Sequence, residues 1–166
     1  MERKRVVIIG AVALGPKVAC RLKRLKPETE VVMIDQDEHI SYGGCGIPYF
    51  ISGDISEVRE LMSTSFHMER TPKFFEDAKD VRTKIRTRAL SIDRQGKKVR
   101  IQDLTSGAEE DLPYDQLVLA MGSQPNRLPI PGADLPEVIS VSNLKSAMAI
   151  KERRTDEVEA AAPAAN

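Results

Sequence analysis

Two short apolar runs near the start of the chain flank a stretch of helical pattern. Residues 6–9 read Val-Val-Ile-Ile and residues 31–34 read Val-Val-Met-Ile. Uninterrupted runs of this length, rich in β-branched residues, are typical of strands buried on both faces of a parallel sheet. Between them, apolar residues recur at helical spacing on one face: Val18, Leu22 and Leu25. We therefore expect a βαβ unit, with a helix that begins at Pro16 and ends near Lys26.

Further along the chain, polar and apolar residues alternate. Ile85, Leu90 and Ile92 on one segment, and Val99 and Ile101 on the next, alternate with polar residues. Turn sequences follow both segments and a third strand is expected near 110–112, which predicts a three-stranded antiparallel meander. Thr71-Pro72 is typical of a helix N-cap followed by the first helical residue, so we expect a short helix that ends at Lys79. Leu117–Ala120 is another uninterrupted apolar run and predicts a central strand.

The last quarter of the chain has a different character. Four prolines between residues 123 and 136 predict an extended crossing segment. Residues 138–141 are expected to form one more strand, and Ser142 to cap a helix that ends near Lys151. Residues 153–166 are charged and then alanine-rich, without the apolar periodicity of a core element. We expect this tail to be disordered or non-native.

Composition narrows the class of protein. A chain of 166 residues fits one domain of ordinary size. Lys plus Arg and Asp plus Glu both number 25, so no net charge favours nucleic acid or an anionic membrane. Two cysteines without CxxC spacing predict neither a disulfide framework nor a zinc site, and we expect no metal. A reducing, cytoplasmic setting is the simplest interpretation.

The N-terminus also imitates a secretory signal. Residues 1–5 are basic, an apolar run follows over 6–14, and Val18-Ala19-Cys20 imitates a lipid-attachment site. The run is short for a signal peptide, and Lys17 stands where a lipid-attachment motif has an apolar residue. The strand, turn and helix interpretation explains the same residues with fewer exceptions.

A glycine-containing turn follows the first apolar run. Gly10 and Gly15 occupy the first and third glycine positions of G-x-G-x-x-G, and Val12 replaces the middle one. In this motif a pyrophosphate lies at the helix N-terminus, where free amides and the positive end of the helix dipole meet it. Asp35 ends the second apolar run, 25 residues after Gly10, about where a ribose-binding carboxylate is expected. The pattern predicts a dinucleotide site, and an ordinary βαβ unit is the alternative.

A single cysteine stands in the most unusual stretch of the chain. Residues 41–53 read Ser-Tyr-Gly-Gly-Cys-Gly-Ile-Pro-Tyr-Phe-Ile-Ser-Gly. The glycines around Cys45 offer little to bury it and leave backbone amides accessible, which favours a redox role for this thiol. The alternative is a structural free cysteine. Cys20, within the first expected helix, is predicted to pack in the core.

These segments together resemble the pyridine nucleotide-disulfide oxidoreductases, over residues 4 to about 152. The branch with one cysteine is the most similar: coenzyme A-disulfide reductases, NADH oxidases, NADH peroxidases and persulfide reductases. Besides the turn, Asp35 and the cysteine segment, three pieces carry the resemblance: Thr71-Pro72, Leu119–Ser123 and Pro129–Gly132. Met121 departs from the family pattern, which has threonine there, and the coenzyme A branch also lacks the middle glycine that Val12 replaces.

The resemblance implies a Rossmann-like α/β FAD-binding domain, with a parallel sheet and a three-stranded antiparallel meander. We expect residues 1–152 to be a partial FAD-binding domain, incomplete at its C-terminal end. The domain for NAD(P)H and the interface of a homodimer would belong to a longer parent enzyme. The implied FAD-binding positions are Gly10, Ala11, Val12, Ala13, Gly15, Asp35, Gln36, Ala89, Ala120 and Gly122.

The implied activity is electron transfer from NAD(P)H through flavin to Cys45, with Ser41 and Tyr42 near a thiol substrate. Because the family branch uses one cysteine, the second sulfur comes from the substrate, or oxygen oxidises the thiolate. The acceptor stays open among coenzyme A disulfide, persulfide, peroxide and oxygen. Two other hypotheses are a non-catalytic module that binds FAD or another nucleotide, and an inert truncated fragment. For the enzyme we expect a small-molecule substrate, without nucleic acid or membrane, whereas the non-catalytic module would need a separate partner chain.

Overall fold

A computed structural model describes the backbone of residues 4–161 and the side chains of residues 4–153. The chain divides into two compact units. The sheet unit comprises the described parts of Met1–Gly43 and Met62–Gly122, and the cysteine unit comprises those of Gly44–Leu61 and Ser123–Asn166. Each unit is described by itself.

The sheet unit contains a four-stranded parallel sheet. Its strands lie in the order β3-β2-β1-β7, with β1 at Arg5–Ile9, β2 at Glu30–Ile34, β3 at Arg82–Lys84 and β7 at Gln116–Leu119. All three strand pairs are parallel. The apolar runs predicted β1, β2 and β7, whereas β3 contains no such run and was not predicted by one. The prediction of a central strand at 117–120 was wrong, because β7 is an edge strand among the described residues and Leu119 is 53% exposed. An apolar run indicates that the faces of a strand are buried, but it does not indicate where the strand lies in the order of the sheet.

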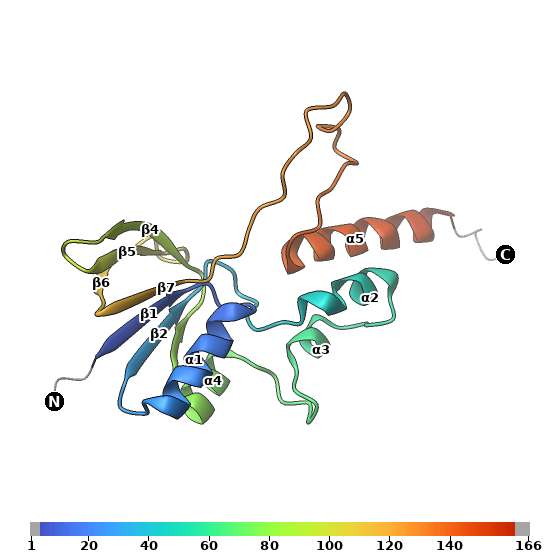
Figure 1. The fold of residues 1–166 in the computed structure, drawn as a ribbon. Helices are drawn as coiled ribbons and strands as arrows, with labels where there is room; N and C mark the ends of the chain where they lie inside the picture. Colours follow the sequence, from blue (N-terminus) through green and yellow to red (C-terminus); the bar gives the residue numbers. More distant parts are fainter. Residues whose placement is uncertain (1–3, 162–166) are drawn as a thin grey trace. The chain divides into compact units, whose positions relative to one another are not determined.

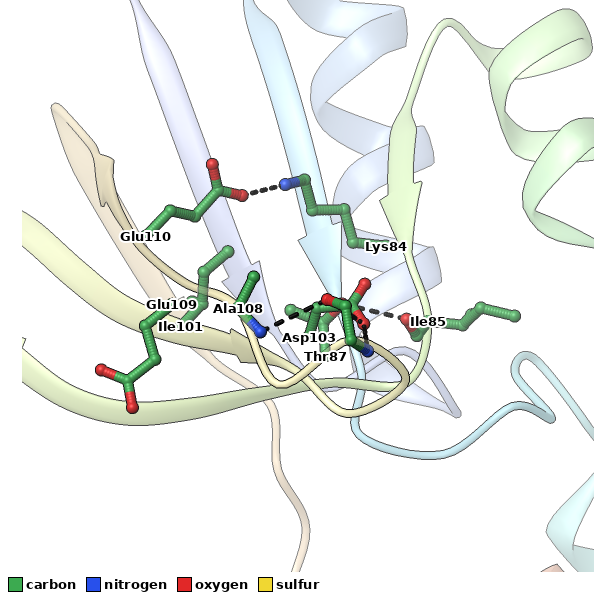
Figure 2. Close-up of a pocket in the computed structure, with 9 residues that line it drawn as sticks. Lys84, Ile85, Thr87, Ile101, Asp103, Ala108, Glu109 and Glu110 are labelled. Carbon is green, nitrogen blue, oxygen red and sulfur yellow. Dashed lines mark hydrogen bonds and ion pairs between the residues drawn. The ribbon is translucent and has the colours of Figure 1, made fainter.

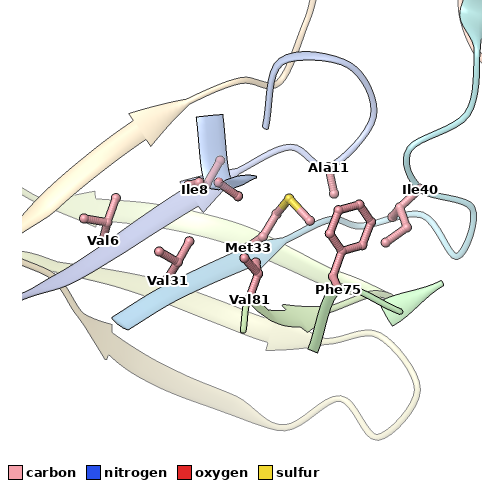
Figure 3. Close-up of a cluster of buried hydrophobic side chains, with 9 residues drawn as sticks. Val6, Ile8, Ala11, Val31, Met33, Ile40, Phe75 and Val81 are labelled. Atoms are coloured by element: carbon pink, nitrogen blue, oxygen red, sulfur yellow. The ribbon is translucent and has the colours of Figure 1, made fainter. Parts of the chain in front are cut away.

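Both faces of the parallel sheet are covered. On one face, side chains of β1 and β2 pack with Phe75 of α4 (Figure 3). Ala19 of α1 belongs to the same core. The opposite face packs against the meander through Val99, Ile101 and Leu112. Alternate residues of the two strands therefore enter two separate cores, which explains why their sequences are apolar throughout.

Two helices flank the first of these cores. Helix α1 spans Leu14–Leu25 and thus begins two residues before Pro16, where the sequence predicted its start. Leu25 is 62% exposed, so it does not lie on the buried face as expected. Helix α4 spans Pro72–Lys79, as predicted, and the Phe74 N–H donates to the Oγ1 of its N-cap, Thr71, at 3.1 Å.

The side chain of Lys23 ties the end of α1 to neighbouring segments. Its Nζ donates to the carbonyl oxygens of Pro27 (2.5 Å) and Thr29 (2.9 Å) and pairs with Asp80 Oδ2 (2.5 Å). The Lys23 side chain is nearly buried, whereas that of Asp80 is mostly exposed. Because α1 ends close to β2 and α4, this ammonium joins three elements.

We expect Lys23→Met to lower the free energy of unfolding by about 1–3 kcal/mol, because partly buried carbonyl oxygens lose their donor. The measurement is urea unfolding followed by circular dichroism. The control is Asp80→Asn, which keeps the lysine and its two carbonyl partners and changes only the exposed acceptor. Equal stability of Lys23→Met and the wild type would contradict this role.

The predicted meander is confirmed. Strands β4 (Thr87–Asp93), β5 (Lys98–Asp103) and β6 (Glu109–Pro113) form a three-stranded antiparallel sheet. The pairing of β4 with β5 shifts register between Ala89 and Ser91. Leu90 and Ile92 are exposed, whereas Thr87 is buried and Ala89 packs against the core. The register shift marks a β-bulge, which changes the direction of the side chains along the strand. Alternation of polar and apolar residues therefore does not predict which residues of β4 are buried.

The cysteine unit is helical. It contains η1 (Gly44–Gly46), α2 (Ile47–Ser52), most of α3 (Val58–Met62) and α5 (Leu144–Ala161). Helices α2 and α5 lie side by side (Figure 1), and Lys151 Nζ of α5 lies 4.0 Å from the centre of the Phe50 ring. The same Nζ donates to the carbonyl oxygens of Ile55 and Ser56.

Three expectations for the last quarter need correction. Residues 138–141 form no strand, and the proline-rich segment before them is extended, with a turn near residues 132–137. Helix α5 is capped by Asn143 in place of Ser142, because Asn143 Oδ1 accepts the Ser146 N–H at 2.9 Å. Helix α5 continues to Ala161, past Lys151, where the sequence predicted its end, and residues 162–166 of the expected tail lie outside the described residues. No helix in the described part of the chain is both long and apolar enough to span a membrane.

Candidate functional site

The glycine turn of the sheet unit is so tight that two positions have no room for a side chain. Gly10 has φ +104°, and a Cβ on it would lie 2.2 Å from the carbonyl oxygen of Ala120. A Cβ on Gly15 would lie 1.9 Å from the carbonyl oxygen of Gly10. Val12, at the middle position, is half-buried. The first and third glycines thus let the backbone of the turn pass close to β7 and to α1.

The N-terminus of α1 has no capping side chain. Ala13 is the N-cap residue and provides no side-chain hydrogen bond, and the first turn contains no acidic residue. Backbone N–H groups at this end are therefore not satisfied by side chains of the cap, and the helix dipole adds positive potential. This donor set fits an anion such as the pyrophosphate of a dinucleotide.

Asp35 lies directly after β2 and contacts the turn. Its Oδ2 accepts the Ala11 N–H at 2.7 Å, and its Oδ1 accepts the Asp37 N–H at 3.0 Å. Burial raises the pKa of Asp35 above its ordinary value of 3.8, the two N–H donors oppose this effect, and the charge of Asp37 adds to it. A carboxylate has about four lone-pair sites, so two accepted hydrogen bonds leave capacity for ribose hydroxyls.

The raised pKa predicts how the charge of Asp35 affects stability. Because the folded chain binds this proton more tightly than the unfolded chain, the free energy of unfolding falls as pH rises from 3.8 through the folded pKa. Below both pKa values the destabilisation by this group is absent. The variant Asp35→Asn has no titratable group at this position. We therefore expect the stability of the wild type, relative to Asp35→Asn, to decline with rising pH in urea unfolding series, and parallel curves would contradict this.

The other expected cofactor positions also belong to the sheet unit. The Ala120 N–H donates to the carbonyl oxygen of Ile9 at 2.7 Å, so Ala120 lies beside the turn. Gly122 follows the end of β7, has φ +72° and faces open space. Gln36 is exposed in the loop after Asp35. Ala89 pairs with Ile101 in the meander and packs against the second core, so no recorded contact joins it to the turn.

Cys45 belongs to the cysteine unit and is exposed. It lies in the short 3₁₀ turn η1, and α2 begins two residues later, at Ile47. Cys20 is half-buried and packs against the first core, as expected. The thiol of Cys45 is therefore more accessible to solvent than that of Cys20.

Ser41 and Tyr42, expected near the substrate, are nearly buried in the sheet unit. Ser41 has φ +52°, in the left-handed region, and its N–H donates to the carbonyl oxygen of Ala11 at 2.8 Å. Sequence reasoning missed this backbone role, and no sequence signal points to it. It also missed the hydrogen bond from the Asp37 N–H to Asp35 Oδ1. An aspartate side chain that accepts the N–H two residues later is a recognisable turn pattern.

A cavity of about 450 Å³ lies elsewhere in the sheet unit (Figure 2). Its four charged side chains all have partners: Lys84 pairs with Glu110, Glu109 pairs with Arg100, and Asp103 accepts the Ser106 N–H. Thr87, which is buried, donates to the carbonyl oxygen of Ile85. These polar side chains therefore have partners within the protein, and none of the contacts identifies a ligand.

Known proteins match this chain over nearly all of its described residues. The family model described as Pyridine nucleotide-disulphide oxidoreductase matches residues 4–161. The NAD(P)H sulfur oxidoreductase (CoA-dependent) of Pyrococcus furiosus is 34% identical over 92% of this chain and 32% of its own length. The coenzyme A disulfide reductase of Staphylococcus haemolyticus is 26% identical over 90% of this chain and 32% of its own length.

A solved structure agrees with these matches. The NAD-dependent persulfide reductase from A. fulgidus superposes with a TM-score of 0.85 and 32% identity, over 92% of this chain and 28% of that one. The chain spans about a third of the length of the curated relatives it matches. The match over nearly all of its length shows that the chain belongs to the pyridine nucleotide-disulfide oxidoreductase family.

Proposed function

We propose that this chain forms the FAD-binding part of a disulfide, persulfide or oxygen reductase that uses NAD(P)H. The observation that carries the proposal is the tight turn from Gly10 to Gly15, joined to an uncapped helix N-terminus and to the carboxylate of Asp35. In this proposal the amides at the start of α1 hold the pyrophosphate and Asp35 holds the ribose.

The remaining assignments are part of the same proposal. The cofactor is contacted beside the turn by Ala11, Val12, Ala13 and Gln36. Beyond β7 it is contacted by Ala120 and Gly122, and its adenine is contacted by Ala89. Ala120 is supported by its backbone bond to Ile9 and Gly122 by its open surroundings. Ala89 rests on the family resemblance alone.

Cys45 is proposed as the redox-active residue. Its thiolate attacks one sulfur of a disulfide, the S–S bond breaks, one thiolate leaves, and Cys45 is left in a mixed disulfide. Two electrons and a proton then release the second thiol and restore Cys45. FAD, when bound, supplies the relay for electrons from NAD(P)H. The exposure of Cys45 supports the proposal, because a buried thiol could not meet a substrate.

The names of the relatives support a substrate class. They refer to coenzyme A disulfide, sulfur, persulfide or NADH oxidation. We propose a small disulfide or persulfide as acceptor, with oxygen or peroxide as the other option. Ser41 and Tyr42 are proposed to contact it, an assignment that rests on the family resemblance.

We also propose a cellular setting and an assembly for the whole protein. Two cysteines without a disulfide support a reducing, cytoplasmic setting, and balanced charge supports function without nucleic acid or membrane. A homodimer, and a further nucleotide domain for NAD(P)H, are proposed for the whole protein.

The test is an ultraviolet-visible spectrum of the purified chain after incubation with FAD and gel filtration. We expect flavin absorbance to elute with the protein. Circular dichroism of the same sample separates failure to fold from failure to bind. A folded chain that carries no flavin would refute the proposed site.

A further inference from the structure

The Ala11 peptide is held from both sides by other parts of the sheet unit. Its N–H donates to Asp35 Oδ2 at 2.7 Å, and its carbonyl oxygen accepts the Ser41 N–H at 2.8 Å. The N–H of the preceding residue, Gly10, donates to the carbonyl oxygen of Ile34 at 2.8 Å. The start of the glycine turn is therefore tied to the end of β2 and to the segment that follows it.

A carboxylate suits this position better than an amide. Two N–H donors from different segments, Ala11 and Asp37, reach the two oxygens of Asp35. Asparagine has one acceptor oxygen and would direct its NH₂ group at one of these donors. The backbone of Asp35 is also fixed, because its N–H donates to Lys84 and its carbonyl oxygen accepts the Thr87 N–H.

We propose that Asp35 is a positioning residue, which holds the glycine turn in its pyrophosphate-binding conformation before the cofactor arrives. This inference rests on the proposed function and goes beyond the ribose contact assigned there. A turn held in advance loses less conformational entropy on binding, which tightens the complex. Because the Ala11 N–H is taken by Asp35, the pyrophosphate is met by the amides that follow it, at the start of α1.

The experiment compares Asp35→Asn with Asp37→Asn, in the whole chain. Asp37→Asn removes the same charge, but the recorded bonds of Asp37 are made by its main chain. Amide hydrogen exchange of Ala11 is followed by NMR in the unliganded protein, with the Val32 amide of β2 as reference. Binding is measured for ADP, which has ribose hydroxyls, and for inorganic pyrophosphate, which has none.

We expect Ala11 exchange to become about tenfold faster in Asp35→Asn, and both ligands to bind more weakly by a similar factor. Asp37→Asn should leave both readouts close to those of the wild type. Unchanged Ala11 exchange, with weaker binding of ADP but not of pyrophosphate, would show that Asp35 acts through the ribose alone and would overturn the inference.

Two further outcomes are also decisive. If Val32 exchange rises as well, the sheet has loosened, and Asp35→Glu, which keeps both oxygens, decides: slow Ala11 exchange in that variant supports the inference and fast exchange overturns it. If the wild type binds neither ADP nor FAD, the proposed function fails and the cofactor part of this inference fails with it. The exchange data then still report whether Asp35 holds the turn.

Discussion

Gly10→Ala is expected to abolish retention of FAD and to destabilise the chain. The new Cβ would lie 2.2 Å from the carbonyl oxygen of Ala120, which is backbone and cannot turn aside. Gly10 also has φ +104°, a conformation that costs a residue with a side chain about 1–2 kcal/mol. Overpacking adds about 1–3 kcal/mol, so the free energy of unfolding should fall by roughly 3 kcal/mol in total.

The measurement pairs urea unfolding with flavin absorbance after gel filtration. Gly44→Ala is the matched control, because the same methyl group at Gly44 meets no heavy atom within 4 Å. The control should unfold within about 0.5 kcal/mol of the wild type and keep its flavin. If Gly10→Ala keeps both its stability and its flavin, the turn is not the tight element described above, and the assignment of the FAD site to it is wrong.

The elements that could be predicted from the sequence are those whose causes are local. The apolar runs of β1 and β2 and the Thr71-Pro72 start of α4 are each determined by a few neighbouring residues. The glycine turn was also predictable, since its two glycines are where the backbone passes too close for a Cβ.

What could not be predicted depends on pairing between distant segments. The edge position of β7 is set by its only recorded neighbour, β1, over a hundred residues earlier in the chain. The exposure of Leu90 follows a register shift against β5. The bond from Ser41 to Ala11 joins two backbones, so neither side chain signals it.

Cys45→Ser is expected to eliminate thiol-linked turnover while FAD binding is retained. The substitution changes sulfur to oxygen, and a serine hydroxyl can neither attack a disulfide at neutral pH nor form a mixed disulfide. The glycine turn and Asp35 belong to the sheet unit, whereas Cys45 belongs to the cysteine unit, so the change leaves the recorded contacts of the turn intact.

The assay follows reoxidation of the FAD-loaded chain, reduced with dithionite, when a small disulfide is added. The flavin of the wild type should be reoxidised with release of thiol. The flavin of Cys45→Ser should be reoxidised by the disulfide no faster than free reduced FAD. Thiol labelling of the unloaded chain should show one fast thiol, Cys45, and one slow thiol, Cys20, because only the first is exposed.

Cys20→Ser is the matched control, since it makes the same chemical change at the half-buried cysteine. It should keep disulfide-dependent reoxidation and lose only the slow phase of labelling. Retained turnover in Cys45→Ser would remove the redox role of this cysteine, and the chain would then be a flavin-binding module without thiol chemistry. Loss of turnover in both variants would instead indicate damage to the fold, which the flavin spectrum would reveal. Because Cys45 is exposed in a short glycine-flanked turn, where a substrate can reach its thiol, we expect turnover to be lost in Cys45→Ser and retained in Cys20→Ser.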